Sequence, residues 1–182
     1  EVAKAGIART FQNIRLFAEM TALENVMVGR HIRTKSGLLG AILRTKSFKA
    51  EEAAIAKRAQ ELLDYVGIGG FADYKARTLS YGDQRRLEIA RALATDPQLI
   101  ALDEPAAGMN ATEKVLLREL IDRIRKDNRT ILLIEHDVKL VMGLCDRVTV
   151  LDYGKQIAEG TPYDVQRSEK VIEAYLGAGH KT

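Results

Sequence analysis

Asp103 and Glu104 are two adjacent carboxylates that follow the apolar run Leu99–Leu102 and precede Pro105. An unbroken apolar run predicts a strand covered on both faces. Both carboxylates are then expected at the carboxyl end of that strand, where open α/β sheets bind ligands. One carboxylate could hold a hard cation through oxygen, while its neighbour takes a proton from an attacking water. The same two residues could also simply cap the end of a strand.

Residues 79–86 (LSYGDQRR) have the pattern of a helix start. Ser80 is placed as the N-cap, and Asp83 three residues later completes a capping-box pattern. Taken alone, this pattern indicates only a well-capped helix. However, Gly82 would let the backbone approach a ligand closely, and a helix N-terminus beside a free hydroxyl is a binding site for an anion such as phosphate.

Gln12 and His136 also follow apolar, strand-like segments. An isolated polar residue at such a place is usually part of a solvated loop. Because the carboxyl ends of parallel strands share one edge of a sheet, Gln12, the Asp103-Glu104 pair and His136 are expected at a common edge. Such a group could orient a water, bind a cation and contact a phosphoryl group.

The elements that would position these residues follow from the pattern of the chain. After Leu79, helices and strands alternate, which predicts a parallel sheet flanked by helices. Residues 21–74 carry helix signals, beginning with the capping box of Thr21 and Glu24, and are predicted to form a separate lobe. The predicted strands are residues 6–12, 99–102, 130–134, 147–151 and 156–159. The predicted helices outside the start of the lobe are residues 50–66, 80–94, 112–126 and 137–144.

The composition is that of an ordinary globular protein. Apolar residues make up 46% and charged residues 29% of 182 residues, and the net charge of +3 is too mild to indicate nucleic acid. Cys145 is the single cysteine, so no internal disulfide can form, as expected in a reducing compartment. No apolar run is long enough to span a bilayer. These features predict a cytoplasmic protein.

Taken in order, Gln12, residues 79–84, the Asp103-Glu104 pair and His136 resemble the motifs of the ATP-binding cassette (ABC) nucleotide-binding domain. The resemblance covers essentially the whole chain, and the order and spacing of the motifs make it specific. It implies an α/β fold of P-loop NTPase type, with a parallel sheet core and a helical subdomain.

The resemblance implies a role for each matching residue, with ATP and Mg²⁺ as cofactors. Gln12 corresponds to the Q-loop glutamine that touches magnesium, and Asp103 to the Walker B aspartate associated with magnesium. Glu104 corresponds to the general base for the hydrolytic water, and His136 to the switch histidine.

Other matching residues are implied to contact a nucleotide held by the opposite subunit of a dimer. They are Ser80, Tyr81, Gly82 and Asp83 in the signature motif and Asn110 in the D-loop (residues 107–110). Tyr81 and Asp83 replace the commoner glycine and glutamine of the signature, and Asn110 stands where many relatives carry aspartate. Asp83 is expected to face its own helix cap, because a carboxylate would repel phosphate. Asn110 can also cap a helix together with Glu113.

The sequence contains no G-x-x-x-x-G-K-S/T phosphate-binding loop. In this family the loop precedes the Q-loop, so we expect the chain to lack the N-terminal strand and P-loop part of the domain, and to bind ATP poorly and not hydrolyse it when alone. The family pattern divides the chain into four segments. These are the end of the first core segment with the Q-loop (1–14), the helical subdomain (15–78), the RecA-like core with signature, Walker B, D-loop and switch histidine (79–160), and a C-terminal helical tail (161–182).

Residues 9–17, 23–26 and 106–110 are similar to the larger ATPase of bacterial high-affinity branched-chain amino-acid importers. This similarity implies an ATPase subunit that works with a second ATPase subunit and transmembrane permease subunits, and indirectly with a periplasmic binding protein. It would be peripheral, at the cytoplasmic face of the inner membrane, with no nucleic acid partner. Alternatives are an ABC ATPase for urea or lipopolysaccharide, a non-transport ABC ATPase, or a non-catalytic binding module.

Residues 30–50 contain six basic residues and no carboxylate. The basic residues are Arg30, Arg33, Lys35, Arg44, Lys46 and Lys49. They could form a solvated basic face, or they could lie near anionic headgroups or the membrane subunit.

Overall fold

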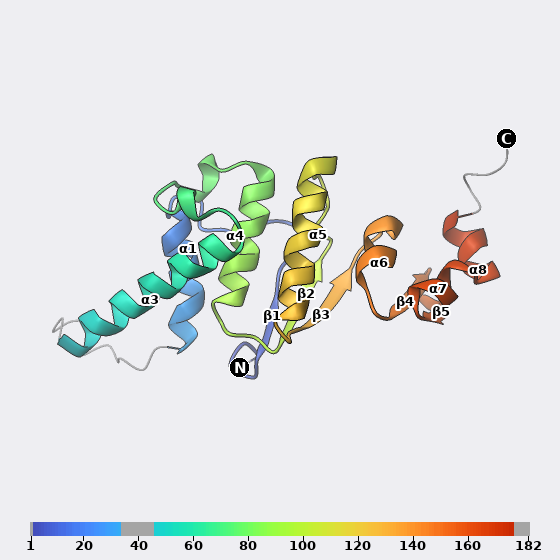
Figure 1. Cartoon of the computed structure of the whole chain (residues 1–182), viewed down its shortest axis with the longest axis horizontal. Coiled ribbons are helices and arrows are strands. Elements are labelled where there is room, and N and C mark those ends of the chain that lie inside the picture. The colour runs from blue at the N-terminus through green and yellow to red at the C-terminus, as the bar shows by residue number, and fades with distance from the viewer. Residues whose placement is uncertain (1, 34–45, 177–182) are drawn as a thin grey trace. The chain divides into compact units, whose positions relative to one another are not determined.

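The computed structural model describes residues 2–33 and 46–176. The chain divides into two compact units, Glu1–Ile134 and Glu135–Thr182. The elements are labelled in Figure 1, and each unit is described by itself below.

The first unit is built on a three-stranded parallel sheet. Its strands are β1 (Ile7–Arg9), β2 (Leu99–Asp103) and β3 (Thr130–Ile134), in the order β1-β2-β3. Arg9 lies beside Ala101, and Asp103 lies beside Ile134. All three strands were predicted, and their parallel pairing puts their carboxyl ends at one edge, as the sequence analysis expected.

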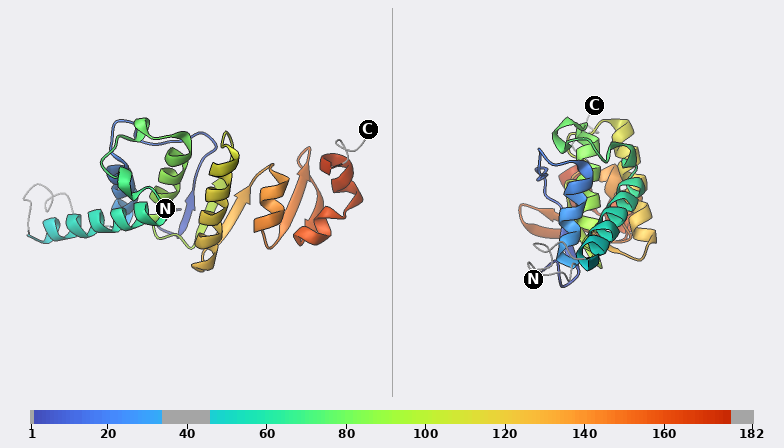
Figure 2. Two further views of the ribbon diagram at one scale, coloured as in Figure 1. Left: turned by 45° about the horizontal axis from the view of Figure 1, so that its top comes forward. Right: turned by 90° about the vertical axis from the view of Figure 1, so that its left-hand side faces the viewer.

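The two faces of this sheet are covered unequally. Ile100 and Leu102 of β2 are fully buried, and helices α4 (Tyr81–Leu93) and α5 (Ala111–Lys126) lie alongside the sheet (Figures 1 and 2). On the opposite face Ile7, Leu132 and Ile134 stay 42%, 53% and 47% exposed. In β2 itself the residues of this face, Leu99, Ala101 and Asp103, are partly buried. The predicted full cover of this strand on both faces is therefore wrong for the described part of the chain.

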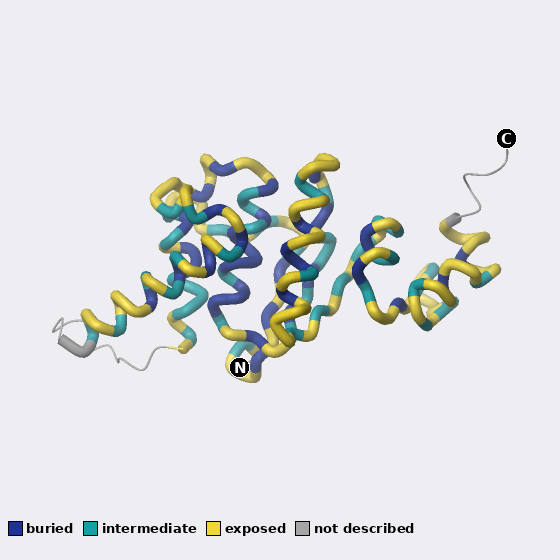
Figure 3. Tube along the Cα trace, in the orientation of Figure 1, coloured by how far each residue is buried: buried dark blue, intermediate teal, exposed yellow. Residues whose placement is uncertain are grey.

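Helix α4 is the central element of the first unit. It contacts α1 (Ala22–Arg30), α3 (Lys46–Tyr65) and β1, and the tube in Figure 3 is buried along most of its length. Leu87, Ile89 and Leu93 of α4 are fully buried. Close packing on several sides fixes the position of the helix, and with it the position of the residues at its N-terminus.

Helices α1 and α3 pack beside α4. The predicted capping box at α1 is confirmed: Glu24 N donates to Thr21 Oγ1 at 3.1 Å, and Thr21 N donates to Glu24 Oε2 at 2.8 Å. On α3 the buried residues recur at helical spacing, at Ile55, Ala59, Leu62 and Leu63. Short 3-10 turns at His31–Arg33, Gly69–Phe71 and Ala76–Thr78 complete this region. The division of the chain at residues 14 and 78 stays a prediction.

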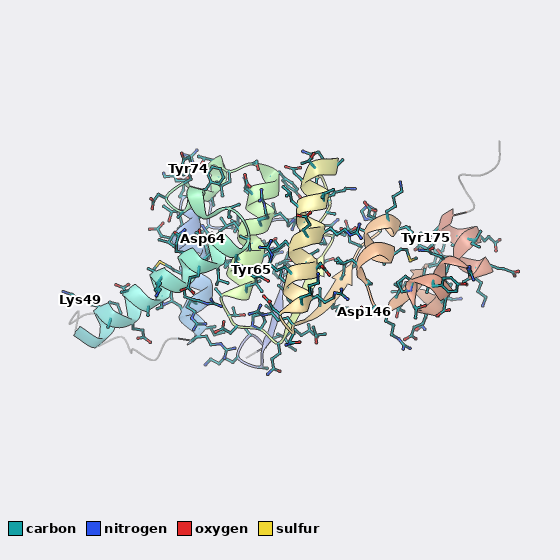
Figure 4. The ribbon with its side chains drawn as sticks, viewed as in Figure 1. Lys49, Asp64, Tyr65, Tyr74, Asp146 and Tyr175 are labelled. Carbon is teal, nitrogen blue, oxygen red and sulfur yellow. The ribbon has the colours of Figure 1, made fainter. Side chains whose placement is uncertain are left out.

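Tyr65 joins the end of α3 to the end of α5 (Figure 4). Its hydroxyl donates to Asp127 at 2.7 Å, and its carbonyl accepts from Arg123 at 2.8 Å. Burial raises the pKa of the Tyr65 hydroxyl, and the hydrogen bond to Asp127 raises it further.

The second unit contains a short helix, a β-hairpin and a helical end. Its elements are α6 (Val138–Leu144), β4 (Val148–Asp152), β5 (Lys155–Gly160), α7 (Pro162–Gln166), α8 (Glu169–Val171) and the π turn Ile172–Leu176. The core is formed by Val148, Val165 and Val171. Strands β4 and β5 pair antiparallel and are joined by a two-residue turn, Tyr153-Gly154. Both turn residues have positive φ, as is typical of tight hairpin turns.

Part of the basic segment 30–50 is described. Arg30 pairs with Asp96, and Arg33 Nε donates to the Thr95 carbonyl at 2.8 Å, so both residues tie the end of α1 to the loop after α4. Lys49 is exposed. Lys35, Arg44 and the side chain of Lys46 lie outside the described residues, so the membrane hypothesis for this segment stays a prediction. None of the described helices has the length and apolar character of a membrane span.

Candidate functional site

Gln12 and Glu104 meet at the carboxyl edge of the sheet. Gln12 Nε2 donates to Glu104 Oε2 at 2.9 Å, although the two residues are 92 positions apart. Glu104 has φ of 43°, in the left-handed region, and its backbone N–H donates to the Ile134 carbonyl at 2.8 Å. The chain thus turns sharply after β2 while staying bound to β3. A non-glycine residue in this conformation is strained, and such strain is common at functional sites.

Asp103 is paired with Arg9 across the sheet. Arg9 Nη2 lies 2.8 Å from Asp103 Oδ2, and the Asp103 side chain is 21% exposed. Arg9 was not among the site residues predicted from the sequence. It could have been found from the strand pattern, because Arg9 is the last residue of β1 and residues at parallel strand ends gather at one edge.

The donor atoms near Asp103 fit a magnesium ion only in part. Carboxylate and amide oxygens from Asp103 and Gln12 are hard ligands of the kind Mg²⁺ prefers. Among residues 2–33 and 46–176, however, no cluster of three or more His, Cys, Asp or Glu side chains could hold a metal. Protein-bound Mg²⁺ usually takes one or two carboxylates together with substrate phosphates and water, and that is the arrangement these residues allow.

The N-terminus of α4 carries the predicted phosphate contacts. Asp83 N donates to Ser80 Oγ at 3.2 Å, and the Ser80 hydroxyl donates to Asp83 Oδ2 at 2.7 Å. The other carboxylate oxygen of Asp83 accepts from Arg86 at 2.5 Å. Asp83 therefore faces its own helix cap, where it accepts from the hydroxyl of Ser80 and not from the Ser80 backbone N–H. The predicted capping box is only half formed.

Arg85 connects this helix to the chain around Gln12. The Arg85 side chain is 0% exposed and donates to the carbonyls of Phe11 at 2.6 Å and Gln12 at 2.7 Å. It also pairs with Glu88 at 2.9 Å. Arg85 was not among the residues predicted from the sequence. The available signal was an oppositely charged pair, Arg85 and Glu88, at i, i+3 in the first two turns of the predicted helix.

Asn110 and Glu113 form a complete capping box at the start of α5. Glu113 N donates to Asn110 Oδ1 at 3.0 Å, and Asn110 N donates to Glu113 Oε2 at 2.9 Å. This confirms the capping role that the sequence allowed for Asn110. Glu113 also closes the space beside Gly82, because a Cβ on Gly82 would lie 2.7 Å from Glu113 Oε1.

His136 belongs to the second unit. Its side chain is 72% exposed, and its Nδ1 lies 3.8 Å from Glu135 Oε2. The next residue, Asp137, caps α6 by accepting from Leu140 N at 3.2 Å. The structure thus brings Gln12, Asp103 and Glu104 together within the first unit and places His136 at the start of the second.

Comparison with known proteins identifies the class. Residues 1–107 match the family model described as ABC transporter, and residues 155–181 match the one described as Branched-chain amino acid ATP-binding cassette transporter. The crystal structure of the ADP conformation of MJ1267, an ATP-binding cassette of an ABC transporter, matches with a TM-score of 0.77 at 32% identity, covering 97% of this chain and 70% of that one. The chain belongs to the ABC transporter family of ATP-binding cassettes. The predicted α/β fold of P-loop NTPase type is confirmed.

Two relatives are more similar to this chain in sequence than the MJ1267 structure is. The chain is 48% identical to the high-affinity branched-chain amino acid transport ATP-binding protein LivG of Escherichia coli K12, covering 97% of this chain and 70% of LivG. It is 45% identical to the protein of the same description, BraF, from Pseudomonas aeruginosa, with the same coverage. The resemblance to ATPases of branched-chain amino-acid importers is therefore confirmed.

Proposed function

We propose that this chain is an ATP-binding subunit of an ABC importer, in which ATP hydrolysis drives the uptake of branched-chain amino acids. The main observation in support of ATP hydrolysis is the Gln12–Glu104 hydrogen bond of 2.9 Å at the carboxyl edge of the sheet. The similarity to LivG and BraF supports the transported substrate.

Glu104 is the general base in this proposal. Its carboxylate takes the proton of the attacking water, and the Gln12 amide holds that carboxylate in place through the donated hydrogen bond. The turn at Glu104, bound to β3 through the Ile134 carbonyl, keeps the side chain at the sheet edge. Proton transfer by a well-placed base contributes about 10²- to 10⁴-fold to a rate.

Asp103 and Gln12 would hold the magnesium ion, which neutralises charge on the phosphates when bound. Arg9 occupies one oxygen of Asp103, so the ion would use the oxygen that Arg9 leaves available or displace the half-exposed arginine. The residues assigned to the ATP of a partner subunit are those at the start of α4 and at the start of α5: Ser80, Tyr81, Gly82, Asp83 and Asn110. His136 is assigned a catalytic role, as the switch histidine.

The partners follow from this assignment. We propose a head-to-tail pair of ATPase subunits, identical or different, bound to transmembrane permease subunits at the cytoplasmic face of the inner membrane. A periplasmic binding protein would deliver the amino acid to the permease. The ATPase subunit itself would contact the membrane only through the permease.

The substitution Glu104→Gln in the assembled transporter tests the proposal. It retains the size of the side chain and removes the base, so we expect ATP turnover to fall by about 10²-fold or more and the ATP-bound dimer to persist. Glu119→Gln, at an exposed position of α5, is the matched control and should hydrolyse ATP normally. Leucine uptake into vesicles is measured in parallel. Normal turnover in Glu104→Gln would contradict the proposal. ATP-driven transport that does not take up leucine, isoleucine or valine would also contradict it.

A further inference from the structure

Arg85 holds the backbone that carries Gln12. Its two terminal nitrogens donate to consecutive carbonyls, Phe11 at 2.6 Å and Gln12 at 2.7 Å. The planar guanidinium has a fixed fork of donors, so two bonds to neighbouring carbonyls restrain the orientation of the peptide between them. The Gln12 Cα lies between these two carbonyls, and its side chain extends from there to Glu104.

The burial of Arg85 is not explained well by stability. A buried ion pair such as Arg85–Glu88, with side chains 0% and 2% exposed, often contributes little net stability, because both charges lose their water. In addition, Arg85 Nε is buried without a hydrogen-bond partner in the described structure, which is unfavourable. An arginine kept at this place is better explained by the geometry that it imposes on the Gln12 segment.

Tyr81 extends this arrangement to two further segments. Its hydroxyl accepts from Arg85 Nη2 at 3.1 Å. Its ring lies against Gly108, where a Cβ would be 3.3 Å from the ring carbon Cε1, and Gly108 has φ of +74°. Tyr81 also directly follows Ser80 in the chain. The Tyr81–Arg85 pair therefore contacts the Gln12 segment, the start of α4 and the loop before α5 at once.

We propose that Arg85 and Tyr81 are positioning residues that keep the Gln12 amide on the Glu104 carboxylate and couple this contact to the turn at Ser80. This inference rests on the function proposed above. A glycine, which is commoner at this position of the signature, has no side chain that could bond to Arg85. The link between Ser80 and Arg85 therefore depends on the tyrosine at position 81. Movement at Ser80 would be transmitted through Tyr81 and Arg85 to the base.

Tyr81→Phe tests the pair with little risk to folding, because the ring is retained and the residue is 43% exposed. The loss of one hydrogen bond to a charged group should lower kcat for ATP by about three- to tenfold. KM should stay within about twofold, because the base acts on water and the ring contacts are kept. Amide hydrogen exchange in residues 10–15 of the nucleotide-free protein should become faster, since the carbonyl clamp is weakened.

Tyr65→Phe is the matched control, because it also removes a tyrosine hydroxyl that is hydrogen-bonded at 2.7 Å, but between α3 and α5. It should change neither kcat nor exchange in residues 10–15. Arg85→Lys is the second variant, which retains the charge for Glu88 and loses the fork, and it should lower kcat more than Tyr81→Phe.

The outcomes separate this inference from the proposed function. If Glu104→Gln hydrolyses ATP normally, the proposed function fails. If Glu104→Gln is inactive while Tyr81→Phe retains wild-type kcat and exchange, only the positioning role is refuted. A rise in KM alone, or an equal loss of kcat in Tyr65→Phe, also overturns the positioning role.

Discussion

The substitution Gly82→Ala tests whether packing against Glu113 requires a glycine at the second position of α4. A Cβ at Gly82 would lie 2.7 Å from Glu113 Oε1 and 3.0 Å from Glu113 Cδ, closer than real contacts. The Glu113 carboxylate would have to withdraw, and its 2.9 Å bond to Asn110 N would be strained or lost. The glycine thus has a packing reason within its own subunit, separate from any contact with a nucleotide.

The expected energies come from two opposing effects. Alanine in place of glycine favours a helix by up to about 1 kcal/mol. Disturbing the capping box of α5 costs about 0.5–2 kcal/mol. In the wild-type background the two effects nearly cancel or the cap loss dominates. In a Glu113→Ala background the obstruction is absent, so Gly82→Ala should stabilise. The coupling energy between the two substitutions should therefore be about 1 kcal/mol.

Urea unfolding of the wild-type protein, both single variants and the double variant measures this coupling directly. If the effects add within about 0.5 kcal/mol, the Gly82–Glu113 contact does not restrict this position, and the packing argument fails. ATP turnover of the assembled transporter, with each of the same four sequences in turn, then shows whether the glycine has a second role. A variant that is stable but slow in turnover would assign Gly82 to the nucleotide as well.

Two further predictions concern the packing that supports the site. Gly29→Ala should lower the free energy of unfolding by about 1–3 kcal/mol, because a Cβ would overlap the Arg91 carbonyl oxygen and lie 3.1 Å from Arg91 Cγ. Gly70→Ala, where a Cβ would meet nothing within 4 Å, should leave the free energy of unfolding nearly unchanged. Urea unfolding of both variants measures the difference. The pKa of Tyr65 is raised in the folded state, so the neutral hydroxyl is favoured there. Its stabilising effect should be complete below pH of about 10 and be lost as the pH rises above that value. Urea titrations across this range should show a shallower alkaline loss of stability in Tyr65→Phe, and an equal slope would contradict the assignment.

The local features of the chain could be predicted from the sequence. The strand that ends at Asp103, the caps at Thr21 and Asn110 and the helix that begins after Ser80 all depend on residues within a few positions of one another. Periodicity and capping chemistry act at this range, so a single sequence reveals them. The order of the motifs also sufficed to indicate an ABC cassette.

The contacts that give the site its geometry were decided by the tertiary structure. Arg85 reaches the Phe11 carbonyl across 74 positions, and Arg9 reaches Asp103 across 94. Neither pair has a local signal, because strand order, register and helix packing must first bring the segments together. The exposed face of the sheet at Leu132 escaped prediction for the same reason, since an apolar strand has the same sequence whether one face or both are covered. The sequence by itself determined which residues could do the chemistry. The order and register of the strands, together with the packing of α4, decided which of them touch.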